Sequence, residues 1–390
     1  MNRSLYCQGK EPCINNLYKN EAAKPKDGLS VRSAHTLLVC KRRRTTPVWM
    51  DWLQNCASYL CKAPHTHRIS FQHRNQMIPD HKNKIAVLLM AHGGPDSLDD
   101  IEPFLGHIMK GRVPSAEMIA TVKDRYRQIG AKSPLLAITN QQAAALEAAL
   151  NARGGKFRVY VGMRHWSPYI KDTVREILNE KPSHLVAISM APQYARMSVG
   201  AYIEAVRGAL SDLGGTGLSA SFVPHWHTQP LLLDAFSKKV KSRIAAYSEP
   251  IRSSVSLVFT AHSLPESILA EGDPYPTHLQ ETMDGVVARL GALLPPQNIS
   301  FAYQSRGMSG GKWLGPDMED VIKNMADHRA ILMAPIGFVA DHVEILYDID
   351  IYYKEMAKLK GITLDRIESL NTSPLFIHAL AAVVHANLPL

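Results

Sequence analysis

A seven-residue pattern occurs twice in this chain, each time directly after a short apolar run. The first copy reads Ala-His-Gly-Gly-Pro-Asp-Ser at 91–97, and the second reads Ala-His-Ser-Leu-Pro-Glu-Ser at 261–267. The two copies are 170 residues apart, so His92 and His262 occupy matching positions. The same pattern at the ends of two apolar runs predicts two lobes of similar structure.

The residues around these copies alternate short apolar runs with amphipathic segments, which is typical of parallel sheets with helices on both faces. We predict an α/β fold of two similar Rossmann-like lobes, at 85–250 and 251–390, with an active-site cleft between them. The strands are expected at Ile85–Met90, Arg158–Gly162, His184–Met190, Ser219–Pro224, Ser256–Thr260, Ile299–Gln304 and Ala330–Pro335. The helices are expected at Thr139–Arg153, Tyr169–Asn179, Gly200–Leu213, Leu231–Ala246, Thr277–Leu293, Pro316–Met325, His342–Lys358 and Pro374–Asn387.

The positive net charge of the chain is concentrated in one segment. Residues 1–84 contain 15 of the 44 Lys/Arg and 5 of the 35 Asp/Glu residues, whereas the remainder contains 29 and 30. The near-neutral remainder argues against nucleic-acid binding. All five cysteines also lie in 1–84, which fits a reducing compartment. We interpret 1–84 as a disordered or spurious basic extension, with an organelle transit peptide as the alternative.

No apolar run approaches the roughly 18 residues that a membrane-spanning helix needs. The longest is Ile85–Met90, which ends just before His92. We therefore expect no transmembrane segment and a cytoplasmic location.

Polar residues that could bind a ligand or take part in a reaction follow the apolar runs. Ligands of such folds bind beyond the carboxyl ends of the strands, where His92, His262 and the segment 341–344 (Asp-His-Val-Glu) are expected. A lone histidine there is commonly bonded to backbone, and acidic residues in a first helical turn commonly only cap it. However, Glu344, Tyr347 and Asp348 share one face of the expected helix. Imidazole with carboxylate suits both Fe²⁺ binding and proton transfer.

A hydrolase is the competing interpretation from the residues alone. Residues 307–311 spell Gly-x-Ser-x-Gly after an expected strand, as a nucleophile elbow does. An elbow must pass directly into a helix, whereas Trp-Leu-Gly-Pro at 313–316 intervenes here. A flexible glycine-rich loop is the simpler interpretation.

Several longer stretches carry a family resemblance. They are Tyr-Arg-Gln-Ile-Gly at 126–130, Ser-Pro-Leu at 133–135, Ala-His-Ser-Leu-Pro at 261–265, Gly-Asp-Pro-Tyr-Pro at 272–276, Gln-Ser at 304–305, Trp-Leu-Gly-Pro at 313–316 and Val-Ala-Asp-His-Val-Glu at 339–344. With these motifs in order over 84–390, the chain resembles the ferrochelatases, lyases of haem biosynthesis that insert Fe²⁺ into a porphyrin. The resemblance implies two Rossmann-like lobes without a nucleotide site.

The resemblance also implies roles for residues at the strand ends. His262 and Glu344 would be the catalytic and metal-binding pair, and which of them is base and which is ligand stays open. His92 would be a further metal ligand, although many related enzymes have tyrosine at this position. Tyr347, Asp348 and His165 would support the site.

The chain is most similar to the monoderm-bacterial branch of the family, which uses coproporphyrin III rather than protoporphyrin IX. Coproporphyrin has four propionates, and charged or polar side chains would be needed to bind them. Trp166 or Trp313 would pack on the porphyrin macrocycle. The alternative is that these tryptophans belong to the apolar core. The candidate porphyrin-binding residues are Arg112, Arg125, Tyr126, Ser133, Trp313 and Tyr194.

These implications extend to cofactors and partners. We expect no permanently bound cofactor and no iron–sulfur cluster, with Fe²⁺ and porphyrin as substrates. A monomer is favoured, and a peripheral membrane contact around 109–118 stays open. The alternatives are a haem-binding or haem-delivery protein without turnover, and a chelatase for another tetrapyrrole or metal.

Overall fold

The computed structural model describes residues 84–307, 311–325 and 330–389. The basic extension predicted at 1–84 lies outside these residues, apart from Lys84 at its end. Ser309 of the Gly-x-Ser-x-Gly sequence also lies outside them. The helix after that loop, α10 (Met318–Asn324), begins several residues beyond it, so the geometry of a nucleophile elbow is not formed.

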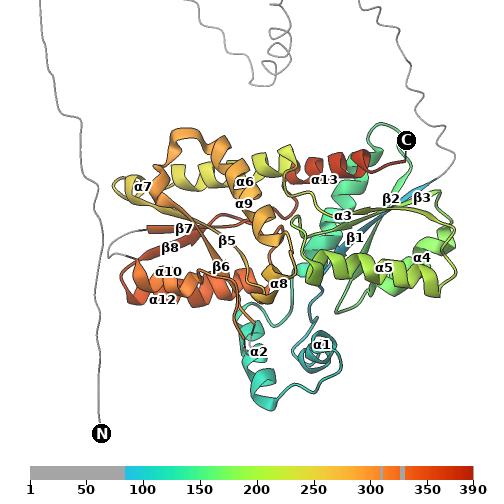
Figure 1. The fold of residues 1–390 in the computed structure, drawn as a ribbon, viewed down its shortest axis with the longest axis horizontal. Helices are drawn as coiled ribbons and strands as arrows, with labels where there is room; N and C mark the ends of the chain where they lie inside the picture. Colours follow the sequence, from blue (N-terminus) through green and yellow to red (C-terminus); the bar gives the residue numbers. More distant parts are fainter. Residues whose placement is uncertain (1–83, 308–310, 326–329, 390) are drawn as a thin grey trace, which may run out of the picture. The chain divides into compact units, whose positions relative to one another are not determined.

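Two four-stranded sheets form the framework, and all their strands run parallel (Figure 1). The first has the order β2-β1-β3-β4, and the second has the equivalent order β6-β5-β7-β8. The prediction of two similar lobes is therefore confirmed. The strands are β1 (Ile85–Ala91), β2 (Phe157–Met163), β3 (His184–Ser189), β4 (Ser219–Val223), β5 (Ser256–His262), β6 (Ile299–Gln304), β7 (Ala330–Pro335) and β8 (Thr363–Arg366).

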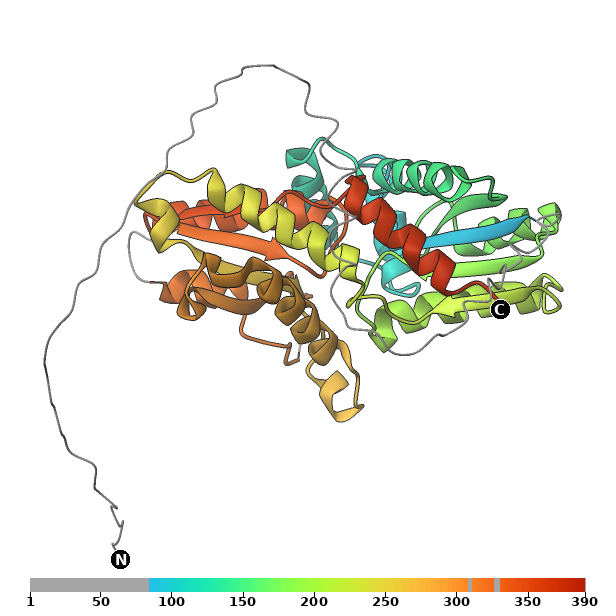
Figure 2. The ribbon, with the colours of Figure 1, turned by 90° about the horizontal axis from the view of Figure 1, so that it is seen from above.

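Helices cover both faces of the sheets. One face is covered by α3 (Leu135–Asn151), α6 (Pro230–Ala245), α9 (Tyr275–Leu290) and α13 (Pro374–Ala386). Their order in space is α3–α13–α6–α9, so α13 touches both α3 and α6 (Figure 2). The residues of this layer form one apolar cluster with β1 and β5, so a single core joins the two sheets. The other faces are covered by α4 (Ile170–Glu180) and α5 (Ala201–Asp212) on the first sheet, and by α10 and α12 (Lys354–Leu359) on the second.

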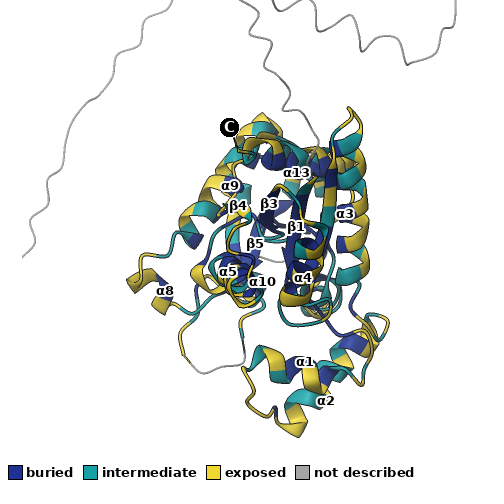
Figure 3. Cartoon of the chain, turned by 90° about the vertical axis from the view of Figure 1, so that its right-hand side faces the viewer, coloured by how far each residue is buried: buried dark blue, intermediate teal, exposed yellow. Residues whose placement is uncertain are grey.

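Two longer helices, two four-residue helices and one strand were not predicted. The longer ones, α1 (Ile101–Ile108) and α2 (Ala116–Gln128), lie apart from the layers that cover the sheets (Figure 3). In α2 the apolar residues Met118, Ile119 and Val122 are only partly buried around Tyr126. Such a short stripe among charged residues is a weak signal in sequence. Strand β8 has four residues and buries only Leu364 fully, which leaves no apolar run to recognise. The short helices α7 (Ile251–Ser254), α8 (Ser267–Ala270) and α11 (Val343–Leu346) complete the set of α-helices in the described residues.

The segment predicted as one helix at His342–Lys358 is divided, and that prediction is wrong. It consists of α11, a π-helical turn at Asp348–Tyr353, and α12. A π-turn inserts an extra residue into the helix, which a pattern of apolar spacing does not reveal. A second π-turn, Arg196–Gly200, precedes α5.

None of the helices in the described residues is long and apolar enough to cross a membrane.

Candidate active site

The two copies of the repeated pattern adopt the same local arrangement. Strand β1 ends one residue before His92, and β5 ends at His262. Nδ1 of each ring forms a hydrogen bond with the carbonyl oxygen of the next residue. His92 pairs with Gly93 at 3.0 Å, and His262 pairs with Ser263. A neutral ring that donates from Nδ1 keeps the lone pair on Nε2. Both strand ends therefore present an Nε2 that can accept a proton or bind a metal.

Glu344 lies between two imidazoles. Its Oε1 is 3.5 Å from Nε2 of His262, and its Oε2 is 3.6 Å from Nε2 of His342. The Nδ1 of His342 is 3.0 Å from the Ala340 carbonyl oxygen, so this ring is oriented like the other two. Some 30% of the Glu344 side chain is accessible, which leaves the carboxylate reachable by a substrate.

The charges around Glu344 determine its ionisation. Burial alone would raise the pKa of this carboxyl, but His262 and His342, with a further contribution from His92, lower the pKa to about 2. The carboxylate is therefore ionised at neutral pH. Burial would lower the pKa of His342, but its hydrogen bond to Glu344 raises the pKa above the usual value for histidine. Although His92 is exposed to solvent, the protein atoms around its ring lower its pKa.

Asp348 is the second acid of the site and has the opposite character. Its Oδ2 accepts a hydrogen bond from Oγ of Ser305 at 2.5 Å, and its Oδ1 is 3.8 Å from Nη1 of Arg125. Burial, with the charge of Glu344, raises the pKa of Asp348 to about 6. The Arg125 guanidinium also lies 5.3 Å from the centre of the Tyr347 ring. Tyr347 and Asp348 therefore meet Arg125 from α2, a helix that the sequence did not reveal.

The Asp348→Asn variant is expected to gain stability over the parent as the pH rises. The folded protein binds the Asp348 proton more tightly than the unfolded chain does, so the parent loses stability between about pH 4 and pH 6. Asparagine has no such proton and still accepts from Ser305. We expect the difference in free energy of unfolding between variant and parent to grow by about 2 kcal/mol from pH 4 to pH 7.5. Urea unfolding at both pH values measures it, and a difference independent of pH contradicts the assignment.

Sequence reasoning missed three residues that contact His262 or Glu344. His342 was inside a recognised motif but was assigned no role. Gln304 is buried, accepts from Oγ1 of Thr260 at 2.7 Å, and donates to the Glu344 carbonyl oxygen at 3.2 Å. The Tyr275 hydroxyl donates to the His262 carbonyl oxygen at 3.0 Å. All three lie in the family motifs, so the available signal was the motif and not the pattern of apolar spacing.

A polar network holds the loop before Glu344. The Asp341 carboxylate accepts from Oγ of Ser369 at 2.7 Å and from Nδ2 of Asn371 at 2.8 Å. Arg366, at the end of β8, approaches Asp341 at 3.2 Å and Asp350 at 2.8 Å. Asp350 is thus paired with Arg366.

The candidate porphyrin-binding residues are in different environments. Ser133 and Tyr126 are buried beside the first repeat, and the Ser133 amide donates to the Pro95 carbonyl oxygen at 2.8 Å. Trp313 pairs through its backbone with Pro265, three residues after His262. Arg112 is exposed in the α1–α2 connection. The amide of Tyr194 donates to His278, which is not part of the group around Glu344.

His165 and Trp166 form an aromatic group with His92. The rings of His165 and His92 have centroids 4.6 Å apart, and burial lowers the pKa of His165 to about 3. Nε1 of Trp166 donates to Asp96 at 3.0 Å, and the indole meets the Phe104 ring edge-on. His165 is therefore a neutral neighbour of His92, and its supporting role stays a prediction.

Gly94→Ala is expected to destabilise the protein, because the added methyl group would push the first repeat away from Ser133, just before α3. A Cβ at this position would lie 2.6 Å from Cβ of Ser133 and 2.5 Å from its Oγ. We expect a loss of about 1–3 kcal/mol, the usual cost of overpacking. Ser133→Gly removes both clashing atoms, so a double-mutant cycle measured by urea unfolding should show the two substitutions compensating by about 1 kcal/mol or more. Simple additivity would contradict the close approach of the two loops.

Comparisons with known proteins give the chain relatives along most of its length. The family model described as Ferrochelatase matches residues 84–388. A curated Ferrochelatase of Deinococcus radiodurans is 39% identical over 302 residues, covering 77% of this chain and 95% of that protein. A Coproporphyrin III ferrochelatase of Geobacillus kaustophilus is 39% identical over 308 residues, covering 78% and 96%. Among solved structures, the sirohydrochlorin chelatase SirB of Bacillus subtilis is 13% identical, with a TM-score of 0.45 over 78% of this chain and 95% of that one.

The family match spans both sheets and every residue placed around Glu344. The pairing of two repeated histidines with that carboxylate thus occurs within a stretch that the family model covers continuously. The chain belongs to the ferrochelatase family.

Proposed function

We propose that this chain inserts Fe²⁺ into coproporphyrin III. As a member of its family it is a lyase that inserts a metal ion into a porphyrin. The proposal specifies the ion as Fe²⁺ and the porphyrin as coproporphyrin III. The observation that carries the proposal is the ionised Glu344 between His262 and His342, with His92 at the equivalent strand end of the first lobe. Imidazole and carboxylate are suitable ligands for Fe²⁺, and two or three of them bind weakly enough to release it.

The reaction replaces two pyrrole protons with one Fe²⁺ ion, so a base and a counter-charge are both required. Glu344, with its pKa of about 2, is too weak a base to hold a proton at neutral pH. We assign it the role of stabilising positive charge, either on the metal or on a protonated imidazole. The Nε2 lone pair of His262 accepts the pyrrole protons one at a time, and because this side chain is partly exposed it releases each proton to solvent before taking the next. His92, whose pKa is lowered, stays neutral and offers its Nε2 to the metal.

Positive side chains on α2 and the α1–α2 connection suit the choice of coproporphyrin, which carries two more propionates than protoporphyrin IX. Arg125 is partly exposed and stands against Tyr347 and Asp348 of the site. Arg112 is exposed, with its Nε 3.3 Å from the Met109 carbonyl oxygen. A relative named Coproporphyrin III ferrochelatase, at 39% identity, supports the same choice.

Arg112→Gln is expected to raise KM for coproporphyrin III by about 10-fold, because a charged hydrogen bond is worth about 1.5–3 kcal/mol. Protoporphyrin IX, with fewer carboxylates, should be affected less. Steady-state kinetics with both porphyrins measures the effect, and Arg153→Gln, an exposed arginine just beyond α3, is the control. Equal increases in KM for the two porphyrins would show that Arg112 does not discriminate between them.

The proposed function is tested with the purified full-length chain under anaerobic conditions. Fe²⁺ is added with coproporphyrin III or protoporphyrin IX, and loss of the free-porphyrin spectrum is followed. Faster consumption of coproporphyrin supports the proposal. Faster consumption of protoporphyrin retains the reaction and overturns the substrate, whereas binding of both without metallation favours a haem-binding protein.

A further inference from the structure

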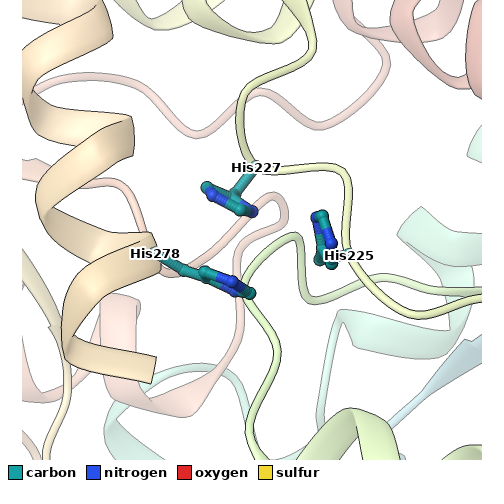
Figure 4. Close-up of side chains that lie close together, drawn as sticks. All are labelled: His225, His227 and His278. Atoms are coloured by element: carbon teal, nitrogen blue, oxygen red, sulfur yellow. The ribbon is translucent and has the colours of Figure 1, made fainter. Parts of the chain in front are cut away.

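Three histidines form a second cluster, which shares no residue with the group around Glu344 (Figure 4). His225 and His227 follow β4 directly, and His278 lies near the start of α9. One ligand nitrogen from each ring can be chosen so that all three lie within 4.8 Å of one another. The sequence signal is His-x-His directly after an apolar strand, which we had not assigned to any function.

His227 is arranged as a metal-binding histidine would be. Its Nε2 is 2.6 Å from Oε2 of Glu281, so the neutral ring donates from Nε2 and keeps its lone pair on Nδ1. That Nδ1 is buried and has no hydrogen-bond partner among the described residues. A carboxylate behind the ring fixes the tautomer and increases the basicity of the other nitrogen, the arrangement common behind metal ligands. The unpartnered Nδ1 therefore points to a ligand.

His278 and His225 complete the cluster in different ways. The His278 ring is stacked on His227, with centroids 3.9 Å apart, and its Nδ1 accepts from the Tyr194 amide at 3.1 Å. Ligation through this Nδ1 exchanges the hydrogen bond for a metal–nitrogen bond. His225 is exposed, and its ring centroid lies 4.8 Å from that of His278. It gives the buried His227 and the partly buried His278 an entry path from solvent.

The possible ligands of the cluster determine which ions it suits. All three are imidazole nitrogens, and no carboxylate oxygen is among them. Neutral imidazoles bind first-row transition ions, whereas Mg²⁺ and Ca²⁺ prefer oxygen ligands.

We propose that His225, His227 and His278 form a second divalent-cation site, for Zn²⁺ or another first-row transition ion, with Glu281 orienting His227. Three nitrogen ligands leave a fourth position for water. The site goes beyond the proposed function, because it uses no residue of the group around Glu344. A bound ion joins the loop after β4 to α9, the helix on which Tyr275 supports the His262 carbonyl. The ion thereby links a loop of the first lobe to a helix of the second.

The test uses Co²⁺, whose visible spectrum reports four-coordinate nitrogen ligation. The full chain also contains five amino-terminal cysteines and the Glu344 group, both of which can bind metal. All proteins therefore carry His262→Ala and Glu344→Gln, and binding is counted as a difference from this parent. The single variant His225→Gln changes an exposed side chain and keeps the fold. The double variant His225→Gln/His278→Gln removes two of the three ligands. The control is His378→Gln, which changes an exposed histidine on α13.

We expect the parent and His378→Gln to bind one more equivalent of Co²⁺ than the double variant does, with the corresponding visible bands. Zn²⁺ should raise Tm of the parent and of the control but not of the double variant, because a ligand that binds only the folded state stabilises it. Glu281→Gln should weaken binding by about 10- to 100-fold. Equal stoichiometry and equal spectra in the parent and in His225→Gln would overturn the site, whether or not the chain metallates porphyrin.

Discussion

Replacing His262 with alanine is expected to lower kcat for metal insertion by about 100- to 10,000-fold, the range over which a positioned general base accelerates a reaction. The imidazole stands 3.5 Å from Glu344 and presents an Nε2 lone pair. Without it, the pyrrole protons have no nearby acceptor, and Glu344 loses the neighbour that most lowers its pKa. Single-turnover kinetics by absorbance, under anaerobic conditions, measures the chemical step.

Porphyrin binding should survive this substitution, because a small side chain is lost and the aromatic and basic residues remain. Fluorescence titration of the free porphyrin would then give a Kd within a few-fold of the parent. His378→Ala on α13 is the control for removal of an exposed imidazole. An unchanged kcat would exclude His262 as the base, and loss of porphyrin binding would make it a binding residue instead.

Leu88→Ala is expected to cost about 2–5 kcal/mol of unfolding free energy. Leu88 is fully buried at the centre of β1, within the apolar cluster formed with α4 and α5. Its removal leaves a cavity in the strand that leads to His92, and close-packed neighbours fill such a cavity only in part. Equilibrium unfolding in urea, followed by two spectroscopic probes, measures the loss.

Leu359→Ala provides the matched control for this substitution. Leu359 ends α12 with 81% of its surface exposed, so the same change in side chain should alter stability by less than about 0.5 kcal/mol. Similar losses for the two variants would mean that burial in β1 does not account for the effect.

The repeated pattern predicted the most important part of the site from the sequence. His92 and His262 are equivalent because each follows the first strand of its sheet, and strand ends in parallel sheets share one edge. The motif at 341–344 added Glu344, and the structure brings that carboxylate to 3.5 Å from His262. Their chemical roles remain predictions that the kinetic experiments address.

Other parts of the site could not be predicted from spacing. The π-turn at Asp348–Tyr353 replaces part of an expected α-helix, and Asp348 turns inward to Ser305 and Arg125. Arg125 reaches it from α2, where Tyr126 is the one fully buried residue and the other apolar residues are at most partly buried. The pKa of about 6 for Asp348 follows from burial and from Glu344, neither of which is a property of its own sequence neighbourhood.

Apolar periodicity and a repeated motif are local properties of the chain, so the α/β class, the duplication and the histidines at the strand ends could be predicted from the sequence. Which side chains meet depends on how distant segments pack. This packing places Glu344 between His262 and His342, and it brings His278 of α9 to the loop after β4. Ionisation and metal affinity depend on distances between residues far apart in the chain, and folding alone sets those distances.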